Sequence, residues 1–323
     1  MISMEIDEES DPKWNDRLLD SQFGTIYQTK EIASYYEATL GWLNFFLKFT
    51  NQRGEIVGQL MLSAYSRFDK KGKVSKILKK IPVQKSMIYH WVYGPVIFNS
   101  IFNSEISKLL SEFLVSKNCI VSGHEHPLSS GILSLMGKPF QIRRWGTFLI
   151  DLSLGQNVLW NNLDKHAARK NIERSQRRGV HVREMTNSDV SLYHEMLQET
   201  KRKANSDVDI SAVKKLWNNL HNAGFTGFLA FENEIPIGGI LVSFFNKYIN
   251  EWGIARTERD TINKLYSHDR LKWAIIEWGV KNKFRYYDLS GVNPASKTEK
   301  EKGIFRYKEK WGGTYIEYQT CNI

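Results

Sequence analysis

An internal repeat restricts the fold of this chain more than any other feature of its sequence. The stretch FLKFTNQRGEIVGQLMLS at residues 46–63 is matched by FLAFENEIPIGGILVS at residues 228–243. Each copy has an apolar segment, a polar turn with asparagine, and a second apolar segment with an early glycine, which is the pattern of a β-hairpin. The aligned pairs are Phe46/Phe228, Leu47/Leu229, Phe49/Phe231, Asn51/Asn233 and Gly58/Gly238. The repeat predicts two similar domains with one hairpin in each.

The same order of elements follows both hairpins. In the second half, strands are predicted at 248–255 and 284–292. The segment between them is predicted to be a helix, because its apolar residues Leu271, Ala274, Ile275 and Trp278 recur at helical spacing. The first half repeats this order with a strand at 86–97, a helix at 103–117 and a strand at 118–123.

Strands of a hairpin followed by a helix and another strand indicate an α+β domain with a mixed sheet. We therefore expect two tandem domains, at 1–150 and 151–323, with a linker at 147–151. The final strand is free to return to the first domain.

Composition and charge narrow the class of protein. The chain has 323 residues with 41% hydrophobic content, which excludes a disordered chain, and its two cysteines exclude a disulfide scaffold and a four-cysteine zinc site. Its acidic start does not have the pattern of a secretory signal, and its longest apolar stretch, 235–245, is too short to span a membrane. We expect a cytoplasmic protein. The net charge of +10 favours an anionic partner, such as phosphates, RNA or an acidic membrane surface.

Three motifs follow one another in the second half of the chain. They are TFLIDLS with the basic stretch that ends in Gly-Val at residues 147–180, YYDLSGVNP at 286–294, and GIFRYKEKWGG at 303–313. In this order the motifs resemble those of the FemABX family, the aminoacyl-tRNA-dependent peptidyltransferases that add amino acids to peptidoglycan precursors in cell-wall synthesis. The resemblance implies two tandem, duplicated domains of the GNAT acyltransferase fold, aminoacyl-tRNA as the donor, and no cofactor or metal.

Lys308 is the leading catalytic candidate. Within the third motif it matches the lysine that bacterial family members place beside the reacting carbonyl. Aminoacyl transfer passes through a tetrahedral intermediate with a negative oxygen, and a fixed ammonium stabilises such a charge. The alternative interpretation is one surface lysine among many in KEKGIFRYKEK.

A basic stretch between residues 159 and 177 is the candidate for binding phosphates. On a continuous helix, Leu159 and Leu163 share a face with Lys170, Arg174 and Arg177. The resemblance assigns Arg169 to contact with the phosphates of the precursor, a task that suits its forked guanidinium. A solvated basic face is the alternative.

Two neighbouring strands supply the other candidates. Asp288 and Gly291 end the strand 284–292, where the carboxylate can orient an amine and the glycine permits close approach of a ligand, unless both serve only a local turn. The remaining candidates for substrate binding are Glu251, Trp252, Tyr287 and Tyr307.

Several positions depart from the family pattern. Murein-building members have tryptophan and lysine where Ile32 and Tyr36 stand, and often an acidic residue where His126 stands. The identity of the acceptor therefore stays open. His124 and His126 have a spacing that suits a metal, but too few other ligands accompany them. The lysine-rich stretch 69–85 is expected to be a solvated loop.

The hypotheses about the function of the chain differ mainly in the acyl donor that they assume. Acetyl-CoA-dependent GNAT enzymes hold the diphosphate in a glycine-rich loop before the central helix, whereas residues 255–273 contain no glycine. The leading hypothesis is transfer from aminoacyl-tRNA to an amine of a phosphate-bearing cell-envelope precursor or peptide, with peripheral membrane contact allowed. The alternatives are an N-acyltransferase that uses an acyl-CoA or carrier thioester, and a non-catalytic RNA- or membrane-associated binding protein.

Overall fold

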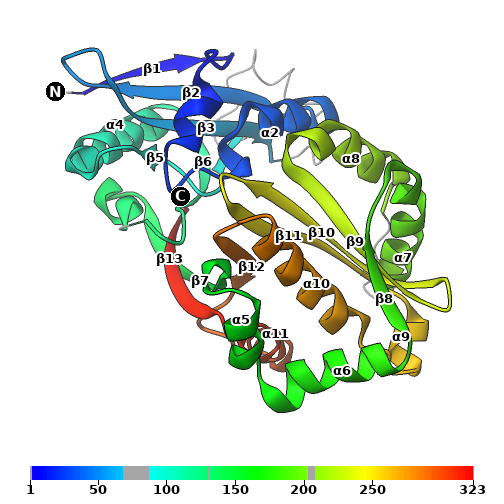
Figure 1. Ribbon diagram of the computed structural model, residues 1–323. Coiled ribbons are helices and arrows are strands. Elements are labelled where there is room, and N and C mark those ends of the chain that lie inside the picture. The colour runs from blue at the N-terminus through cyan, green and yellow to red at the C-terminus, as the bar shows by residue number, and fades with distance from the viewer. Residues whose placement is uncertain (1, 68–86, 130, 203–207, 323) are drawn as a thin grey trace. The chain divides into compact units, whose positions relative to one another are not determined.

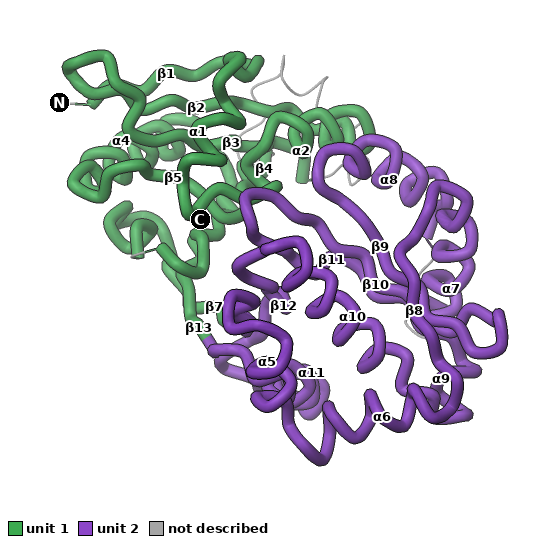
Figure 2. Tube along the Cα trace, in the orientation of Figure 1, with its two compact units in different colours: residues 1–146, 316–323 green, residues 147–315 purple. Residues whose placement is uncertain are grey.

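The computed structural model describes residues 2–67, 87–129, 131–202 and 208–322, so the whole lysine-rich stretch 69–85 lies outside the described residues. The chain divides into two compact units (Figure 2). Unit 1 holds residues 1–146 and 316–323, and unit 2 holds residues 147–315. No helix in the described ranges has the length and apolar character needed to cross a bilayer.

Unit 1 is a mixed sheet with helices (Figure 1). Its strands are β1 (Ser3–Asp7), β2 (Leu43–Thr50), β3 (Ile56–Ser66), β4 (Met87–Trp91), β5 (Val96–Ile97), β6 (Ile120–His124) and most of β13 (Thr314–Asn322). They are ordered β1-β2-β3-β4-β6-β13, with β5 beside β3. Of these pairs, β4 and β6 are parallel, whereas β2 and β3 are antiparallel. The helices are α1 (Trp14–Leu19), α2 (Lys30–Tyr35) and α4 (Asn103–Ser116), and α4 packs Ile106, Leu110 and Leu114 into the core.

Unit 2 repeats this plan. Its strands are the end of β7 (Gln141–Asp151), then β8 (Val180–Glu184), β9 (Phe225–Glu232), β10 (Ile235–Phe245), β11 (Tyr248–Arg256) and β12 (Tyr286–Val292). They are ordered β7-β12-β11-β10-β9-β8. The pair β11–β12 is parallel, as β4–β6 is in unit 1. The helices are α5 (Gln156–Asn162), α6 (Lys170–Arg177), α7 (Val190–Arg202), α8 (Ile210–Gly224), α9 (Glu258–Ile262), α10 (Ser267–Lys281) and α11 (Glu299–Glu309).

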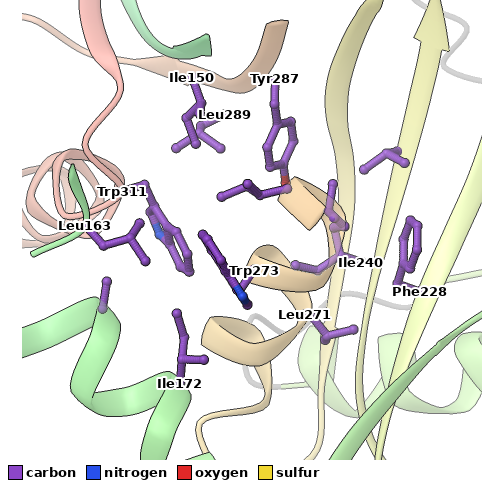
Figure 3. Packing of buried hydrophobic residues seen from close by; sticks show 14 of the residues in the cluster. Ile150, Leu163, Ile172, Phe228, Ile240, Leu271, Trp273, Tyr287, Leu289 and Trp311 are labelled. Carbon is purple, nitrogen blue, oxygen red and sulfur yellow. The ribbon is translucent and has the colours of Figure 1, made fainter. Parts of the chain in front are cut away.

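Helices α7 and α10 lie on opposite faces of the unit 2 sheet. Gly238 and Gly239 are consecutive in β10, so side chains at these two positions would point to opposite faces of the sheet. A Cβ at Gly238 would meet Ser267 of α10, whereas one at Gly239 would meet Tyr193 of α7. Figure 3 shows the core on the α10 side, where Leu271 and Trp273 gather with Ile172 of α6 and with Trp311.

Both hairpins carry a β-bulge at the same place. In the β2–β3 hairpin, Phe49 pairs with Gly58 and Thr50 with Ile56, which leaves Val57 as the extra residue. In the β9–β10 hairpin, Ile237 is the extra residue, again directly before the aligned glycine. The carbonyl of each extra residue accepts a backbone N–H, from Phe98 at 2.9 Å and from Thr257 at 3.1 Å respectively.

The predicted α+β class, the mixed sheets and both hairpins are confirmed. Three details of the prediction are wrong. The segment 86–97 is not one strand, because β4 ends at Trp91 and Tyr93 has a positive φ of 53° before β5 begins. Residues 147–151 are not a linker but the end of strand β7. The basic stretch is not one helix, because Leu163 and Asp164 have extended backbone conformations between α5 and the turn at Lys165–Arg169.

Candidate active site

Lys308 projects from α11 onto the end of β12. The helix begins with a capping box between Thr298 and Glu301, and the side chain of Asn293, just after β12, donates to Glu301 at 2.9 Å. Near the other end of α11, the Lys308 Nζ donates to the carbonyls of Ser290 at 3.0 Å and Gly291 at 2.9 Å. These contacts tie the lysine to the strand rather than to solvent.

One N–H of the Lys308 ammonium remains available. An ammonium has three donors, and two of them are used by the carbonyls of Ser290 and Gly291. The ammonium of the half-buried Lys308 makes no other hydrogen bond or ion pair with the residues that the structure describes. Burial lowers the pKa of Lys308 to about 8, although the nearby carboxylate of Glu251 opposes this shift. The group is thus a held cation with a donor free for a ligand.

Asp288 lies beneath this turn and is fully buried. Its carboxylate accepts from the backbone N–H of Ser290 at 2.8 Å, the Thr147 hydroxyl at 2.5 Å, the Tyr248 hydroxyl at 2.9 Å and the Asn250 amide at 3.3 Å. Since both carboxylate oxygens serve these groups, the geometry favours the turn-forming interpretation of Asp288 over contact with a substrate amine.

A buried ion pair supports the site from α10 and β11. Lys272 is fully buried, and its Nζ donates to the carboxylate of Glu251, which also accepts from the Tyr287 hydroxyl at 2.7 Å. The same Nζ lies 5.6 Å from the ring centroid of Tyr307 and 5.7 Å from that of Trp311. Burial opposes the charge on Glu251, but the pair with Lys272 holds the pKa of this carboxyl below its usual range.

A second ion pair joins α11 to the start of α10. Lys310 pairs with Asp269, and its Nζ lies 4.3 Å from the ring centroid of Tyr307. Desolvation raises the pKa of Asp269 and lowers that of Lys310. The hydroxyl of Tyr307 and the indole N–H of Trp311 are buried without a hydrogen-bond partner in the described part of the chain. The cluster thus combines two buried ion pairs with two polar groups that have no partner among the described residues.

The glycine pair at the end of the third motif lets the chain turn close to other backbone. Gly312 has a φ of 68°, a conformation that side chains rarely adopt, and a Cβ there would strike the backbone carbonyl of Asn162. A Cβ at Gly313 would lie 2.8 Å from the carbonyl oxygen of Leu149. The turn therefore places Trp311 and the end of α11 against α5 and β7.

The basic stretch is divided differently from the prediction. The side chain of Asp164 accepts from the backbone N–H groups of His166 and Ala167, which caps a new turn and stops the helix from continuing out of α5. The side chains therefore do not form the predicted stripe. Arg169 is half-buried and its Nε has no partner within the described residues, Arg174 lies 5.8 Å from the Tyr266 ring, and Lys170 and Arg177 are exposed.

The structure brings most of the other candidates together. Lys308 contacts the carbonyls of Gly291 and Ser290, and Ser290 in turn contacts the Asp288 carboxylate and the backbone carbonyl of Glu251. The Glu251 carboxylate accepts from Tyr287 and Lys272, and the Lys272 Nζ lies near the Tyr307 ring. Trp252 is separate: it is the extra residue in a bulge of β11 and its ring packs edge-on against Phe225. Thr147, Lys272, Asp269 and Lys310 were missed as candidates. Lys272 had a signal, because it lies on the apolar stripe of α10 with Ile275, Ile276 and Gly279.

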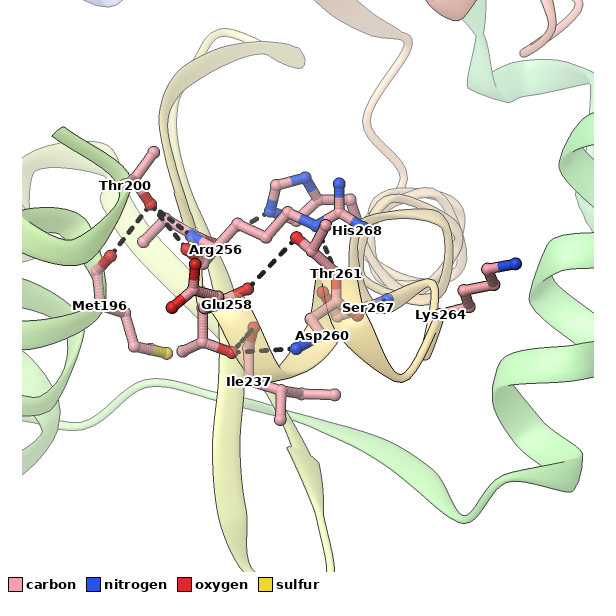
Figure 4. A network of polar contacts seen from close by, with 12 residues as sticks. Met196, Thr200, Ile237, Arg256, Glu258, Asp260, Thr261, Lys264, Ser267 and His268 are labelled. Atoms are coloured by element: carbon pink, nitrogen blue, oxygen red, sulfur yellow. Dashed lines mark hydrogen bonds and ion pairs between the residues drawn. The ribbon is translucent and has the colours of Figure 1, made fainter. Parts of the chain in front are cut away.

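The side-chain carboxylate of Asp260 lies at the N-terminus of α10 (Figure 4). Asp260 is fully buried, accepts from the backbone N–H of Ser267 at 2.8 Å and pairs with Arg256. His268 is hydrogen-bonded to the carbonyl of Ala255 at 3.0 Å, and burial lowers its pKa to about 4. A helix start of this kind binds anions in many proteins. Here the first N–H group is already occupied.

In unit 1, the positions that depart from the family pattern have local partners. Ile32 is buried in α2, and the ring of Tyr36 lies 4.8 Å from that of Trp42. His126 is buried, accepts from the N–H of Leu128 at 3.1 Å, and has its pKa lowered to about 3 by burial. Among the described residues, no group of three or more His, Cys, Asp or Glu side chains is arranged to hold a metal ion.

The comparisons with known proteins agree with this geometry at the level of the fold. No protein-family model and no curated protein sequence matches the chain. The crystal structure of FemX superposes with a TM-score of 0.76 at 13% sequence identity, covering 98% of this chain and 96% of FemX.

Two other solved structures are similar at lower scores. The tandem GNAT protein from the clavulanic acid biosynthesis pathway has a TM-score of 0.55 at 10% identity, covering 100% of this chain and 98% of that one. The C-terminal domain of a candidate lysylphosphatidylglycerol synthetase from Agrobacterium fabrum has a TM-score of 0.55 at 9% identity, covering 95% and 92%. The chain therefore has the tandem GNAT fold of FemX, which confirms, for the fold, the resemblance to the FemABX family.

Proposed function

We propose that this chain is an acyltransferase that moves an amino acid from aminoacyl-tRNA to an amine. The observation that carries the proposal is the geometry of Lys308, whose ammonium is held by two carbonyls and has one donor without a partner in the described part of the chain. The likeness to FemX supports the same class of reaction, since the third motif places Lys308 where family members have their lysine.

The proposed reaction is an aminolysis of an ester. The nitrogen of the acceptor amine attacks the ester carbonyl carbon, and the carbonyl oxygen becomes negative in the tetrahedral intermediate. The free N–H of Lys308 stabilises this oxygen. The new C–N bond then remains while the ester C–O bond breaks, and the proton lost by the amine ends on the tRNA ribose oxygen. The products are an amide and uncharged tRNA.

The start of α10 favours a donor that is not a CoA thioester. In a CoA-dependent enzyme, backbone N–H groups at this position bind the diphosphate. Here Asp260 accepts the N–H of Ser267, and a diphosphate at the same place would meet this carboxylate. Aminoacyl-tRNA needs no such loop, because its phosphates are spread along a larger surface.

The acceptor is proposed to be an anionic precursor of the cell envelope, nucleotide- or lipid-linked. The net charge of +10 and the Nε of Arg169, which has no partner among the described residues, support a phosphate-bearing ligand. Two neighbours, FemX and the candidate lysylphosphatidylglycerol synthetase, support a substrate of this kind. Reaction in the cytoplasm with peripheral contact to a membrane is consistent with a charged-tRNA donor.

The test is a transfer assay with purified protein. A pool of tRNAs charged with labelled amino acids is incubated with the protein and an extract of envelope precursors, and the label is followed into amides. We expect label to leave the tRNA only when protein and acceptor are both present. A parallel incubation with labelled acetyl-CoA is expected to give no transfer. Transfer from acetyl-CoA alone would replace this proposal with a thioester-dependent N-acyltransferase, and no transfer from either donor would favour a binding protein.

The pH dependence of turnover provides an independent measurement. Lys308 stabilises the oxyanion only when protonated, and its pKa is lowered to about 8. Turnover is therefore expected to decline as the pH rises above about 8, with the ammonium fully formed well below that value. The decline is measured as kcat under saturating substrates, so that binding does not contribute. A profile without this decline would argue against a protonated Lys308 in the rate-limiting step.

A further inference from the structure

The turn that holds Lys308 contains a residue in an uncommon backbone conformation. Ser290 has a φ of 63°, in the left-handed region where residues other than glycine are disfavoured. Such conformations are unfavourable and persist only where the surroundings hold them in place. The conformation matters because the carbonyls of Ser290 and Gly291 both accept from the Lys308 Nζ.

Three separate contacts hold Ser290 in this conformation. Its backbone N–H donates to Asp288 at 2.8 Å, and its hydroxyl donates to the backbone carbonyl of Glu251 at 2.6 Å. The third contact is with Thr147, whose hydroxyl lies 2.9 Å from the Ser290 carbonyl oxygen and 2.5 Å from the Asp288 carboxylate. Thr147 is fully buried and stands next to β12 in strand β7.

We propose that Thr147 is a positioning residue for Lys308. The Thr147 hydroxyl touches both the carboxylate that receives the Ser290 N–H and the carbonyl that receives the Lys308 ammonium. It thereby links the acceptor of the Ser290 N–H to the Ser290 carbonyl and stabilises the positive φ of this residue. Lys308 itself sits on a helix without a fully buried residue, so its place depends on these carbonyls. The inference rests on the proposed function for its effect on turnover, but not for its effect on Lys308.

The first measurement does not need a substrate. Lys308 is titrated by the pH dependence of its acylation with a limiting amount of acetic anhydride, read by peptide mass spectrometry. The exposed Lys302 on the same helix is the internal reference. In the unaltered protein the midpoint for Lys308 is expected near its pKa of about 8. In Thr147→Val, which keeps the shape and removes the hydroxyl, the lysine gains access to water and the midpoint is expected to move upward, toward that of Lys302.

The second measurement is turnover. With Lys308 misplaced but present, Thr147→Val is expected to lower kcat about 10-fold or more while KM changes little. Thr147→Ser restores the hydroxyl and is expected to restore both kcat and the midpoint. The matched control is Thr226→Val, because Thr226 is also a buried threonine of unit 2 whose hydroxyl donates to a carboxylate, that of Glu184 at 2.8 Å. This control is expected to change neither readout.

If Thr147→Val does not fold, Ser290→Ala provides a second test of the same turn. Ser290→Ala loses the hydrogen bond to Glu251 and leaves the unfavourable φ in place, so it is expected to move the midpoint upward as well. The double variant Thr147→Val/Ser290→Gly is a further test, because glycine adopts a positive φ without strain. In this variant the Lys308 midpoint is expected to return toward that of the unaltered protein.

Two results would overturn the proposal. One is a Thr147→Val protein in which the Lys308 midpoint and kcat are both unchanged, whatever its melting temperature. The other is a Thr147→Ser protein as impaired as Thr147→Val. If the unaltered protein transfers no amino acid but the midpoint shifts as described, the positioning role stands and the proposed function fails.

Discussion

Replacing Lys308 by alanine is expected to lower turnover about 100-fold or more, the scale for the loss of one oxyanion donor. Binding of the acceptor is expected to change far less, because the negative oxygen exists only in the transition state. Steady-state kinetics with labelled aminoacyl-tRNA separate the two effects, as a fall in kcat at nearly constant KM. The variant is expected to fold, since Lys308 is half-buried and bonded only to carbonyls that water can also reach once the side chain is removed.

Lys302→Ala is the matched control for this experiment. Lys302 lies on the same helix, and its Nζ forms an exposed ion pair with Glu299 at 2.9 Å. Exposed pairs of this kind contribute little to stability. Near-full turnover by Lys308→Ala, with Lys302→Ala equally active, would remove Lys308 from the mechanism and with it the main support for acyl transfer.

Replacing Lys272 by alanine is expected to lower the free energy of unfolding by about 3–5 kcal/mol, the cost of leaving a buried carboxylate without its partner. Lys272 is fully buried, and Glu251 accepts from both its ammonium and the Tyr287 hydroxyl. Urea unfolding monitored by tryptophan fluorescence is suitable, because Trp273 and Trp311 lie in the same core cluster.

Two further variants distinguish the buried charge from a general loss of packing. Lys281→Ala removes an exposed lysine from the last turn of the same helix and is expected to change stability by no more than about 0.5 kcal/mol. Lys272→Met combined with Glu251→Gln removes both charges at similar volume and is expected to recover much of the loss. A Lys272→Ala protein as stable as the unaltered one would show that water reaches Glu251.

The repeat made most of the fold predictable. The hairpins and the helix of each domain follow from apolar spacing, and this spacing is local information. The three errors in the predicted elements also arose from local sequence signals, which were weaker there. Asp164 is a good capping residue inside an otherwise helical stretch, and its effect on the backbone outweighs the pattern of leucines and arginines around it.

The candidate site was predictable only in part. Lys308, Gly291 and Asp288 were found through motifs, but motifs do not show which side chains meet. Thr147 and Asp288 are far apart in the sequence and are joined only because β7 and β12 are neighbours. The pairing of Lys272 with Glu251 likewise depends on α10 packing against the sheet, and no sequence spacing indicates it.

The matched bulges in the two hairpins bear on the history of the chain. An inserted residue reverses the side-chain alternation of everything beyond it in the strand, so a bulge gained in only one copy would have turned that copy's core residues toward the wrong face. Val57 and Ile237 hold the same position relative to their glycines, and both carbonyls receive a backbone N–H, from Phe98 after β5 and from Thr257 after β11. The simplest account is a single insertion in an ancestral hairpin, copied with it when the gene was duplicated. The two hairpins share the bulge position relative to the glycine but not the residue opposite it, because Gly58 pairs with Phe49 whereas Gly238 pairs with Ala230. Each copy thus keeps the bulge while its first strand has its own register, so moving one hairpin into the other unit would shift the pairing by one residue.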